Sequence, residues 1–230
     1  MSSLNSKTKS LIVNTLNEKS MVKKLVFEAY NESFELLKQA LSLLVKELND
    51  ELNDSSRENS IEFQYGNSYL ELYFGTEVIV FSFQNTIFEI DKGHSIWSHS
   101  YIQDHPLNSH VGIIHVYNFL RDSYKNNQNE DLGYLIARIF INQEKHYFAE
   151  GKRQLGFLYN DFSTNIISVD DFKKIIQSAI LYCLDFNMLV PPYEDVSIIS
   201  VEQMKMIINK AKFQSAKRMG FQFYKNDTSV

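Results

Sequence analysis

The stretch "IEFQYGNSYLELYFGTEVIVFSF", residues 61–83, decides the fold class of this chain. It contains three short runs rich in aromatic and β-branched residues, separated by the turn sequences "GNS" and "GT". Leu70, Leu72 and Phe74 alternate with residues of the opposite face, and this period of two is typical of a strand buried on one side. The tight turns predict an antiparallel meander, which the similar runs "TIFEI" and "SIWSHSYI" extend over residues 61–102.

Upstream of the meander, residues 21–52 have the pattern of one long helix, preceded by a flexible segment over residues 1–20. A narrow apolar stripe advances in steps of three and four residues: Phe34, Leu37, Leu41, Leu44 and Leu48. A helix of about 32 residues would be roughly 48 Å long. The stripe fits two arrangements equally well, a helix lying across the sheet or the seam of a homodimer.

Downstream, the sequence predicts a helix over residues 110–126 and a second group of strands over 132–160. The apolar run 132–141 fits a buried helix or a buried strand, and we choose the strand because short strand-like runs follow it. Residues 168–220 are predicted to be helical, with Ser168 as an N-cap. Together these elements predict an α+β fold, with a long N-terminal helix, a mostly antiparallel sheet flanked by helices and a helical C-terminus, as a single domain over residues 21–230.

Composition narrows the classes of protein that this chain can belong to. A single cysteine, Cys183, excludes an intrachain disulfide and disfavours a thiolate zinc site, and its apolar neighbours indicate a small core residue. We expect a cytoplasmic location and no membrane partner, because the sequence shows neither a signal-peptide core nor a run long enough to span a bilayer. The abundance of Asn, Lys and Ile suggests a microbial, prokaryotic source.

The best catalytic hypothesis rests on Glu150 and Lys152, which stand two residues apart in "HYFAEGK". With Asp91 as a distant acid, a Glu-x-Lys strand is the arrangement of a metal-dependent nuclease that holds Mg²⁺ or Mn²⁺. The glycine between the two residues favours a turn instead, and a turn is our interpretation. Arg138, in an apolar run, is expected to pair with Glu150 on an adjacent strand.

Histidines form a second pattern, because five of the six fall within residues 94–115. Neutral imidazoles with a nearby carboxylate can bind a divalent metal, so His94, His99 and His105 are candidate ligands. Their spacing matches no known zinc motif, and the alternative is a polar loop with scattered histidines. No other metal or cofactor is expected.

The segment from Gln203 to Asn226 carries six basic residues and no acidic one, so the remainder of the chain, whose total charge is −5, has a net charge of −11. Cations and aromatic rings together can hold single-stranded nucleic acid or an acidic partner protein. The candidate binding residues are Lys205, Lys210, Lys212, Lys217, Arg218, Phe221 and Phe223. The alternative is a solvated helix followed by an aromatic tail that packs on the rest of the protein.

Taken together, these patterns predict a protein-interaction module of the inhibitor, immunity-protein or complex-subunit kind, which acts by binding rather than by catalysis. Abundant Tyr and Phe suit such interfaces. Two alternatives remain: a metal-dependent nuclease using Asp91, Glu150 and Lys152, and a nucleic-acid-binding module using the basic C-terminal segment. The sequence therefore leaves open whether the chain is an enzyme.

Overall fold

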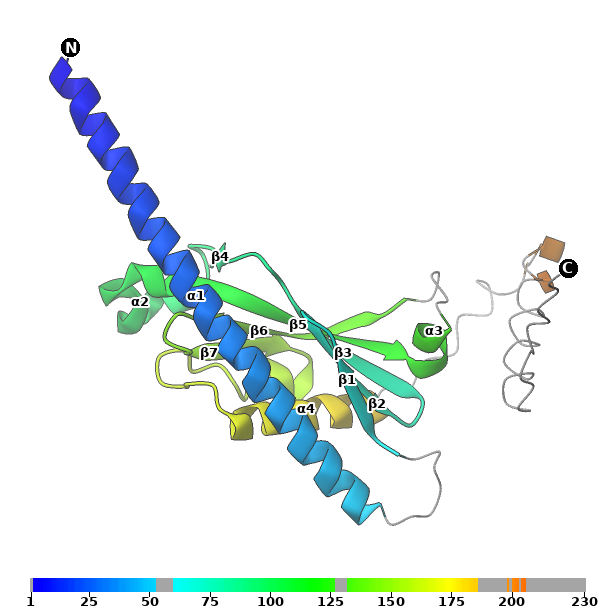
Figure 1. Cartoon of the computed structure of the whole chain (residues 1–230). Coiled ribbons are helices and arrows are strands. Elements are labelled where there is room, and N and C mark those ends of the chain that lie inside the picture. Colours follow the sequence, from blue (N-terminus) through cyan, green and yellow to red (C-terminus); the bar gives the residue numbers. More distant parts are fainter. Residues whose placement is uncertain are drawn as a thin grey trace, which may run out of the picture. The chain divides into compact units, whose positions relative to one another are not determined.

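The computed structural model describes residues 2–52, 60–126, 132–185, 198, 200–202 and 204–205. The chain divides into two compact units, residues 1–186 and 187–230. The first unit has a long N-terminal helix, a seven-stranded antiparallel sheet and a further helix after the sheet, so the predicted α+β fold is confirmed (Figure 1). In the second unit, residues 201–202 and 204–205 are helical. The single domain over 21–230 stays a prediction.

The sheet forms the centre of the first unit. Its strands are β1 (Glu62–Tyr65), β2 (Tyr69–Phe74), β3 (Glu77–Phe83), β4 (Phe88–Glu89), β5 (His110–Leu120), β6 (Tyr134–Asn142) and β7 (Tyr147–Gly151). They lie in the order β1-β2-β3-β5-β6-β7, with the short β4 paired to β5, and every pairing is antiparallel. Neighbouring strands in space are therefore mostly neighbours along the chain, as in a meander.

Two helices cover one face of this sheet, α1 (Ser2–Glu51) and α4 (Val169–Asp185) (Figure 1). The predicted stripe of α1 supplies the core, since Leu37, Leu41 and Leu44 are buried against the sheet and α4. Of the two arrangements that the stripe allowed, the chain adopts the helix lying across its own sheet. These leucines are therefore unavailable as a seam between two copies.

The helix α1 begins at Ser2, whereas a flexible segment was predicted over residues 1–20. At 1.5 Å per residue its 50 residues make a helix roughly 75 Å long. Residues 7–21 are all exposed, and this part of α1 extends beyond the sheet in Figure 1. The predicted start of the helix, residue 21, lies next to Val22, where α1 first becomes buried.

Tyr30 fixes the position of α1 on the sheet. Its hydroxyl donates to the carbonyl oxygen of Ile113 at 2.5 Å and accepts from the backbone N–H of Gln84 at 2.7 Å. Its ring lies against Gly112 of β5, where a Cβ atom would come within 2.6 Å of the ring. Glycine is needed at this position because the helix and the strand approach so closely.

On the opposite face of the sheet, the described part of the chain forms two apolar clusters, one at each end. The helices η2 (Ser95–Ser98), α2 (Ser100–Asp104) and η3 (Pro106–Ser109) close one end over an apolar cluster that includes Ile90, Ile96, Ile102, Phe140 and Phe148. The helix α3 (Arg121–Lys125) lies at the other end, over a cluster of Tyr73, Val78, Val80, Phe119 and Tyr124. A band of polar residues lies between the two clusters.

The helix predicted over residues 110–126 is wrong, because residues 110–120 form the strand β5 and only Arg121–Lys125 are helical. Val111 and Ile113 face one side of the sheet while Ile114 and Val116 face the other. A strand buried on both faces shows a continuous apolar run rather than alternation, and such a run resembles a buried helix. Its β-branched residues were the signal for a strand.

Two further strand predictions are wrong at their ends. Residues 95–102, predicted as the last strand of the meander, lie in η2 and α2. The second group of strands, predicted to reach residue 160, ends at Gly151, after which η4 (Arg153–Gly156) follows. The strand predicted over 132–141 is confirmed as β6. These errors concern short polar segments, whose conformation depends on caps and tertiary contacts more than on periodicity.

The N-cap predicted for α4 is confirmed. The Ser168 Oγ accepts from the Asp171 N–H at 3.2 Å, and Asp171 Oδ2 in turn accepts from the Ser168 N–H at 3.1 Å. This reciprocal pair satisfies donors that would otherwise be free at the helix start. The part of the helical prediction that covers residues 186–197 lies outside the described residues. None of the helices in the described ranges carries an apolar stretch that could cross a bilayer.

Candidate functional site

A row of polar side chains crosses the open face of the sheet. Ser82 on β3 is opposite His115 on β5, His115 is opposite Arg138 on β6, and Arg138 is opposite Glu150 on β7. Side chains at such directly opposed positions lie about 4.5–5.5 Å apart at their Cβ atoms. We call these four residues the polar row. It brings together the predicted site residue Glu150 and its expected partner Arg138.

Both carboxylate oxygens of Glu150 are engaged within the chain. The Arg138 guanidinium donates to Oε2, so the predicted pairing is confirmed. The Nε2 atom of His94 lies 3.3 Å from Oε1. A carboxylate has about four acceptor positions, so these two contacts occupy part of its capacity, one on each oxygen.

Both ring nitrogens of His94 also have partners within the chain. Its Nδ1 accepts from the backbone N–H of Ile96 at 3.3 Å and so caps η2. An accepting Nδ1 carries no proton, so the proton of the neutral ring is on Nε2 and points at Glu150. His94 therefore has no free nitrogen to act as a general base in this arrangement.

The other two residues of the nuclease hypothesis lie in exposed connections. Asp91 Oδ1 accepts from the Gly93 N–H at 2.7 Å within a turn, and Lys152 is exposed immediately after β7. The turn that we interpreted at "EGK" is wrong in detail, because Glu150 and Gly151 are the last residues of β7. Glu150 thus stands on a strand, but its carboxylate faces cationic and imidazole groups of its own chain.

The histidines do not gather into a metal site. His99 ends η2 and His105 ends α2, and neither makes a side-chain capping bond there. In the described part of the chain, no group of three or more His, Cys, Asp and Glu side chains is placed to hold a metal ion. The structure therefore does not bring His94, His99 and His105 together as ligands.

His115 is the residue of the polar row that the sequence analysis did not select. Its Nδ1 atom is buried and has no hydrogen-bond partner among the described residues. Burial, with a smaller effect from the Arg138 guanidinium, lowers the pKa of His115. Its place in the row depends on the register of β5 against β6. That register could not be predicted from the sequence, because residues 110–120 were predicted to be helical.

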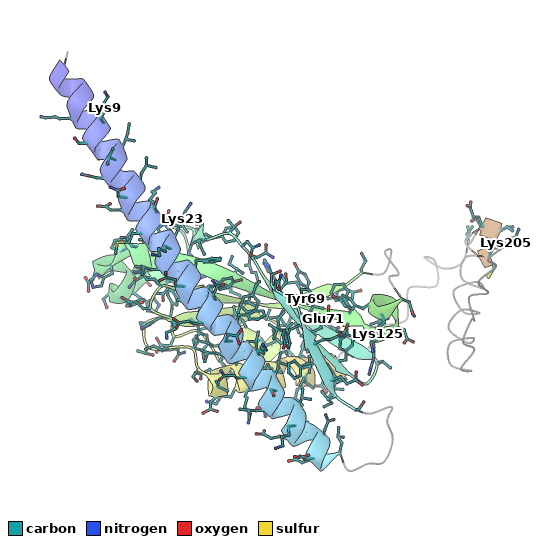
Figure 2. The ribbon with its side chains drawn as sticks, in the orientation of Figure 1. Lys9, Lys23, Tyr69, Glu71, Lys125 and Lys205 are labelled. Carbon is teal, nitrogen blue, oxygen red and sulfur yellow. The ribbon has the colours of Figure 1, made fainter. Side chains whose placement is uncertain are left out.

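The carboxylate of Glu71, beside the polar row, also has hydrogen-bond partners within the chain. Glu71 on β2 accepts from the hydroxyls of Tyr73, at 2.7 Å, and Tyr124, at 2.6 Å. Burial and this carboxylate raise the pKa values of both tyrosines. Figure 2 shows Glu71 on the sheet, with Lys125 of α3 nearby, and the Lys125 Nζ lies 4.7 Å from the Tyr73 ring centroid. This cluster joins α3 to the sheet and serves the fold.

A groove of about 470 Å³ lies on the other side of the sheet, between α1, the β1–β2 turn and the end of β3. It is lined by Phe27, Tyr30, Asn31, Phe34, Glu35, Lys38, Tyr65, Gly66, Asn67, Ser68, Phe83 and Asn85. The sequence does not reveal this groove, because its walls come from three separate segments. On α1 its residues occupy a face beside the predicted core stripe, with which it shares Phe34.

Aromatic rings form much of the wall of this groove. The Phe83 ring lies 4.9 Å from the Tyr30 ring and 5.0 Å, edge on, from the Phe34 ring, measured between centroids. At the rim, Phe27 and Tyr65 are 44% and 53% exposed. The rim thus presents apolar surface to solvent, a feature typical of binding sites.

The polar groups of the groove suit hydrogen bonding better than proton transfer. The Lys38 Nζ lies 3.9 Å from the Tyr65 ring centroid and 3.9 Å from Glu35, so its charge is already held. Burial raises the pKa of Tyr30, whose hydroxyl is engaged at the sheet. Among the described residues, no hydrogen bond involves the side-chain amides of the lining residues Asn31, Asn67 and Asn85.

Two remaining candidates lie away from these sites. Cys183 is buried in the core, and burial raises its pKa to about 12, as expected for a small core residue rather than a nucleophile. Of the C-terminal candidates, Lys205 is exposed on a helical residue. The others, Lys210, Lys212, Lys217, Arg218, Phe221 and Phe223, lie outside the described residues.

Comparisons with known proteins identified no relative of this chain. No protein-family model, no curated protein and no solved structure matches the chain. The function must therefore be argued from the groove and the polar row themselves.

Proposed function

We propose that this chain is a protein-interaction module that acts by binding rather than by catalysis, and that the groove between α1 and the β1–β2 turn is its recognition site. The observation that carries the proposal is the combination of aromatic walls with the exposed amides of Asn31, Asn67 and Asn85, which make no side-chain hydrogen bond to the described residues. The groove combines five aromatic residues with polar side chains, and in binding sites such polar groups fix the orientation of the ligand. An inhibitor, an immunity-type protein or a subunit of a cytoplasmic complex would each use such a site.

The groove is suited to an apolar or aromatic side chain from an extended segment of a partner protein. Such a side chain would contact the rings of Phe34, Tyr65 and Phe83, which are rigid and lose little conformational entropy on binding. Amide side chains can donate to and accept from the backbone of the same segment. The half-exposed Phe27 would become buried, as the central residues of interfaces usually are.

On the face of the sheet opposite the groove, the contacts of the polar row and of His94 favour binding over catalysis. Glu150 and His94 are groups that acid–base or metal chemistry would use, and each contacts partners within the chain through both of its oxygens or both of its ring nitrogens. Catalytic groups need a free position directed at the substrate. The row is better suited to joining β6, β7 and η2 than to attacking a bond.

A displayed library of random peptides, selected on the purified chain, tests this proposal. We expect enriched peptides to share an aromatic or large apolar residue and to bind Phe27→Ala at least roughly tenfold more weakly than the unsubstituted chain, as for loss of a central interface residue. Phe157→Ala is the matched control, because Phe157 is an exposed aromatic residue outside the groove and its removal should not change binding. Enriched peptides that bind Phe27→Ala at full strength would contradict the proposal.

A further inference from the structure

One face of α1 continues from the groove into the part of the helix that extends beyond the sheet. Its residues advance in steps of three and four, the spacing of one helix face: Lys9, Val13, Leu16, Ser20, Lys23, Phe27, Asn31, Phe34 and Lys38. Phe27, Asn31, Phe34 and Lys38 line the groove, and the residues before them are exposed. We call this set the outer stripe. Figure 2 shows Lys9 in the extended part of α1 and Lys23 where the helix reaches the rest of the unit.

The extended part of α1 has little to stabilise it as a lone helix. Residues 7–21 are rich in Ser, Thr and Asn and include the β-branched pair Ile12 and Val13, all of them moderate helix formers. Isolated helices of this length are marginal in water even with better sequences, and packing of an apolar face normally supplies the stability. Val13 and Leu16 are the apolar residues of the outer stripe in this part, and both are more than half exposed.

The charges of α1 are arranged in two blocks of opposite sign. Residues 7–24 contain five lysines and one glutamate, whereas residues 25–37 contain three glutamates and no basic residue. Glu28 and Glu35 make only long ion pairs within the described residues, 3.8 Å to Lys24 and 3.9 Å to Lys38. In an antiparallel pair, the N-terminal lysines of one copy can meet the glutamates of the other, whereas Lys19, Lys23 and Lys24 of both copies lie near the middle of the pair with Glu18.

We propose that a second copy of this chain covers the outer stripe, with the two α1 helices antiparallel and crossing at Ser20. In that register Val13 of one copy lies opposite Phe27 of the other, and Lys9 lies within a turn of Glu28, Asn31 and Glu35. The small side chain of Ser20 allows the helices to approach closely at the two-fold axis. Each contact occurs twice, as a symmetric dimer requires.

The pairing deepens the binding role proposed above and rests on it, because the same face of α1 forms the wall of the groove. Beyond Lys9, the chain of one copy would run past Phe34 and Lys38 of the other, which are groove residues. The N-terminal part of a second copy is then a natural occupant of the groove. This interface is separate from the buried leucines of the core stripe.

Sedimentation equilibrium of the full chain tests the pairing. We expect the unsubstituted chain to have twice the monomer mass of 26.9 kDa and Leu16→Asp to weaken the dimer by roughly tenfold or more, because a charge would be buried at the interface. Leu11→Asp is the matched control. Leu11 is an equally apolar residue of the same helix, 67% exposed against 60% for Leu16, but lies off the outer stripe. A monomeric unsubstituted chain would overturn the proposal, and so would equal effects of the two substitutions.

Cysteine crosslinking tests the antiparallel register. Ser20→Cys should form a disulfide between copies on mild oxidation, because position 20 faces itself across the axis. Val13→Cys should not crosslink to itself, since 14 residues of helix place the two positions about 21 Å apart, but it should crosslink to Phe27→Cys when the variants are mixed. The native Cys183 is buried and should not interfere. Self-crosslinking of Val13→Cys would indicate a parallel pair and overturn the register.

The outcomes also separate this inference from the binding proposal. A monomeric chain that still selects peptides in a Phe27-dependent manner would overturn the pairing and leave the groove as a binding site. A Leu16→Asp monomer that selects no peptide, although its groove is free, would overturn the binding role of the groove and with it the use of that groove by a second copy.

Discussion

Glu150 shows how a single residue can look catalytic in the sequence and yet serve the fold. Its carboxylate accepts from Arg138 on the neighbouring strand and lies within 3.3 Å of His94 before η2, so it joins three elements. The Arg138 pairing was predictable because an arginine in an apolar strand needs a partner. The contact with His94 was not, because it depends on how the segment after β4 folds back over the sheet.

Glu150→Gln tests which of the two roles this residue has. We expect the free energy of unfolding to fall by about 0.5–1 kcal/mol, the usual range for a half-exposed ion pair, as measured by urea denaturation. We also expect no Glu150-dependent cleavage of DNA or RNA with Mg²⁺ or Mn²⁺. Cleavage by the unsubstituted chain that disappears in Glu150→Gln would restore the nuclease hypothesis.

His115 should make the stability of the protein depend on pH. Its pKa is lowered in the folded state, by burial and by Arg138, so at mildly acidic pH the unfolded chain binds more protons than the folded one. Stability should therefore fall as pH drops below about 6.5, the ordinary pKa of histidine. Urea denaturation at pH 7.5 and 5.5 should show a smaller loss for His115→Gln. An identical loss in both proteins would mean that His115 does not carry this effect.

Among the secondary-structure elements, α1 does the most to organise the molecule. Its core stripe was predictable from spacing alone, because one face of the helix is buried and the others are exposed. The partner of that stripe was not predictable, since a seam between two copies and a helix on a sheet give the same pattern. The strand β5 was missed for a related reason: burial on both faces removes the alternation that identified β2 and β3.

Leu41→Ala separates the core role of α1 from a role between copies. Leu41 is buried under the sheet and α4, so its truncation should lower the free energy of unfolding by about 2–5 kcal/mol. Leu43→Ala is the control, because Leu43 is about half exposed on the same helix and should change stability by roughly 0.5 kcal/mol or less. Similar losses from both substitutions would contradict the packing of α1 described here.

Gly112→Ala tests the close contact between α1 and β5. The added methyl group would meet the Tyr30 ring, so either the helix or the strand must shift. Overpacking of this kind usually costs about 1–3 kcal/mol, and thermal denaturation would show it as a lower melting temperature. An unchanged melting temperature would mean that α1 lies farther from the sheet than the structure shows.

For the molecule as a whole, the fold leaves two different surfaces on the two sides of one sheet. One side carries charged groups that pair with one another, whereas the side with α1 carries aromatic rings and amides that make no side-chain hydrogen bond to the described residues. The α+β class could be predicted because the spacing of apolar residues changes along the chain between the helical period and the strand period. The groove was not, because Phe27, Tyr65 and Asn85 become neighbours only when α1 lies across the sheet.

Amide chemical shifts of the ¹⁵N-labelled chain, titrated with N-acetyltryptophanamide as an aromatic probe, would show which surface binds. We predict saturable shifts at Gly66, Asn67, Ser68 and Asn85, which line the groove beside its aromatic walls. Phe27→Ala should weaken them and Phe157→Ala should not. Saturable shifts centred on the polar row, or no saturable shift at the groove residues, would contradict the binding role proposed for this protein.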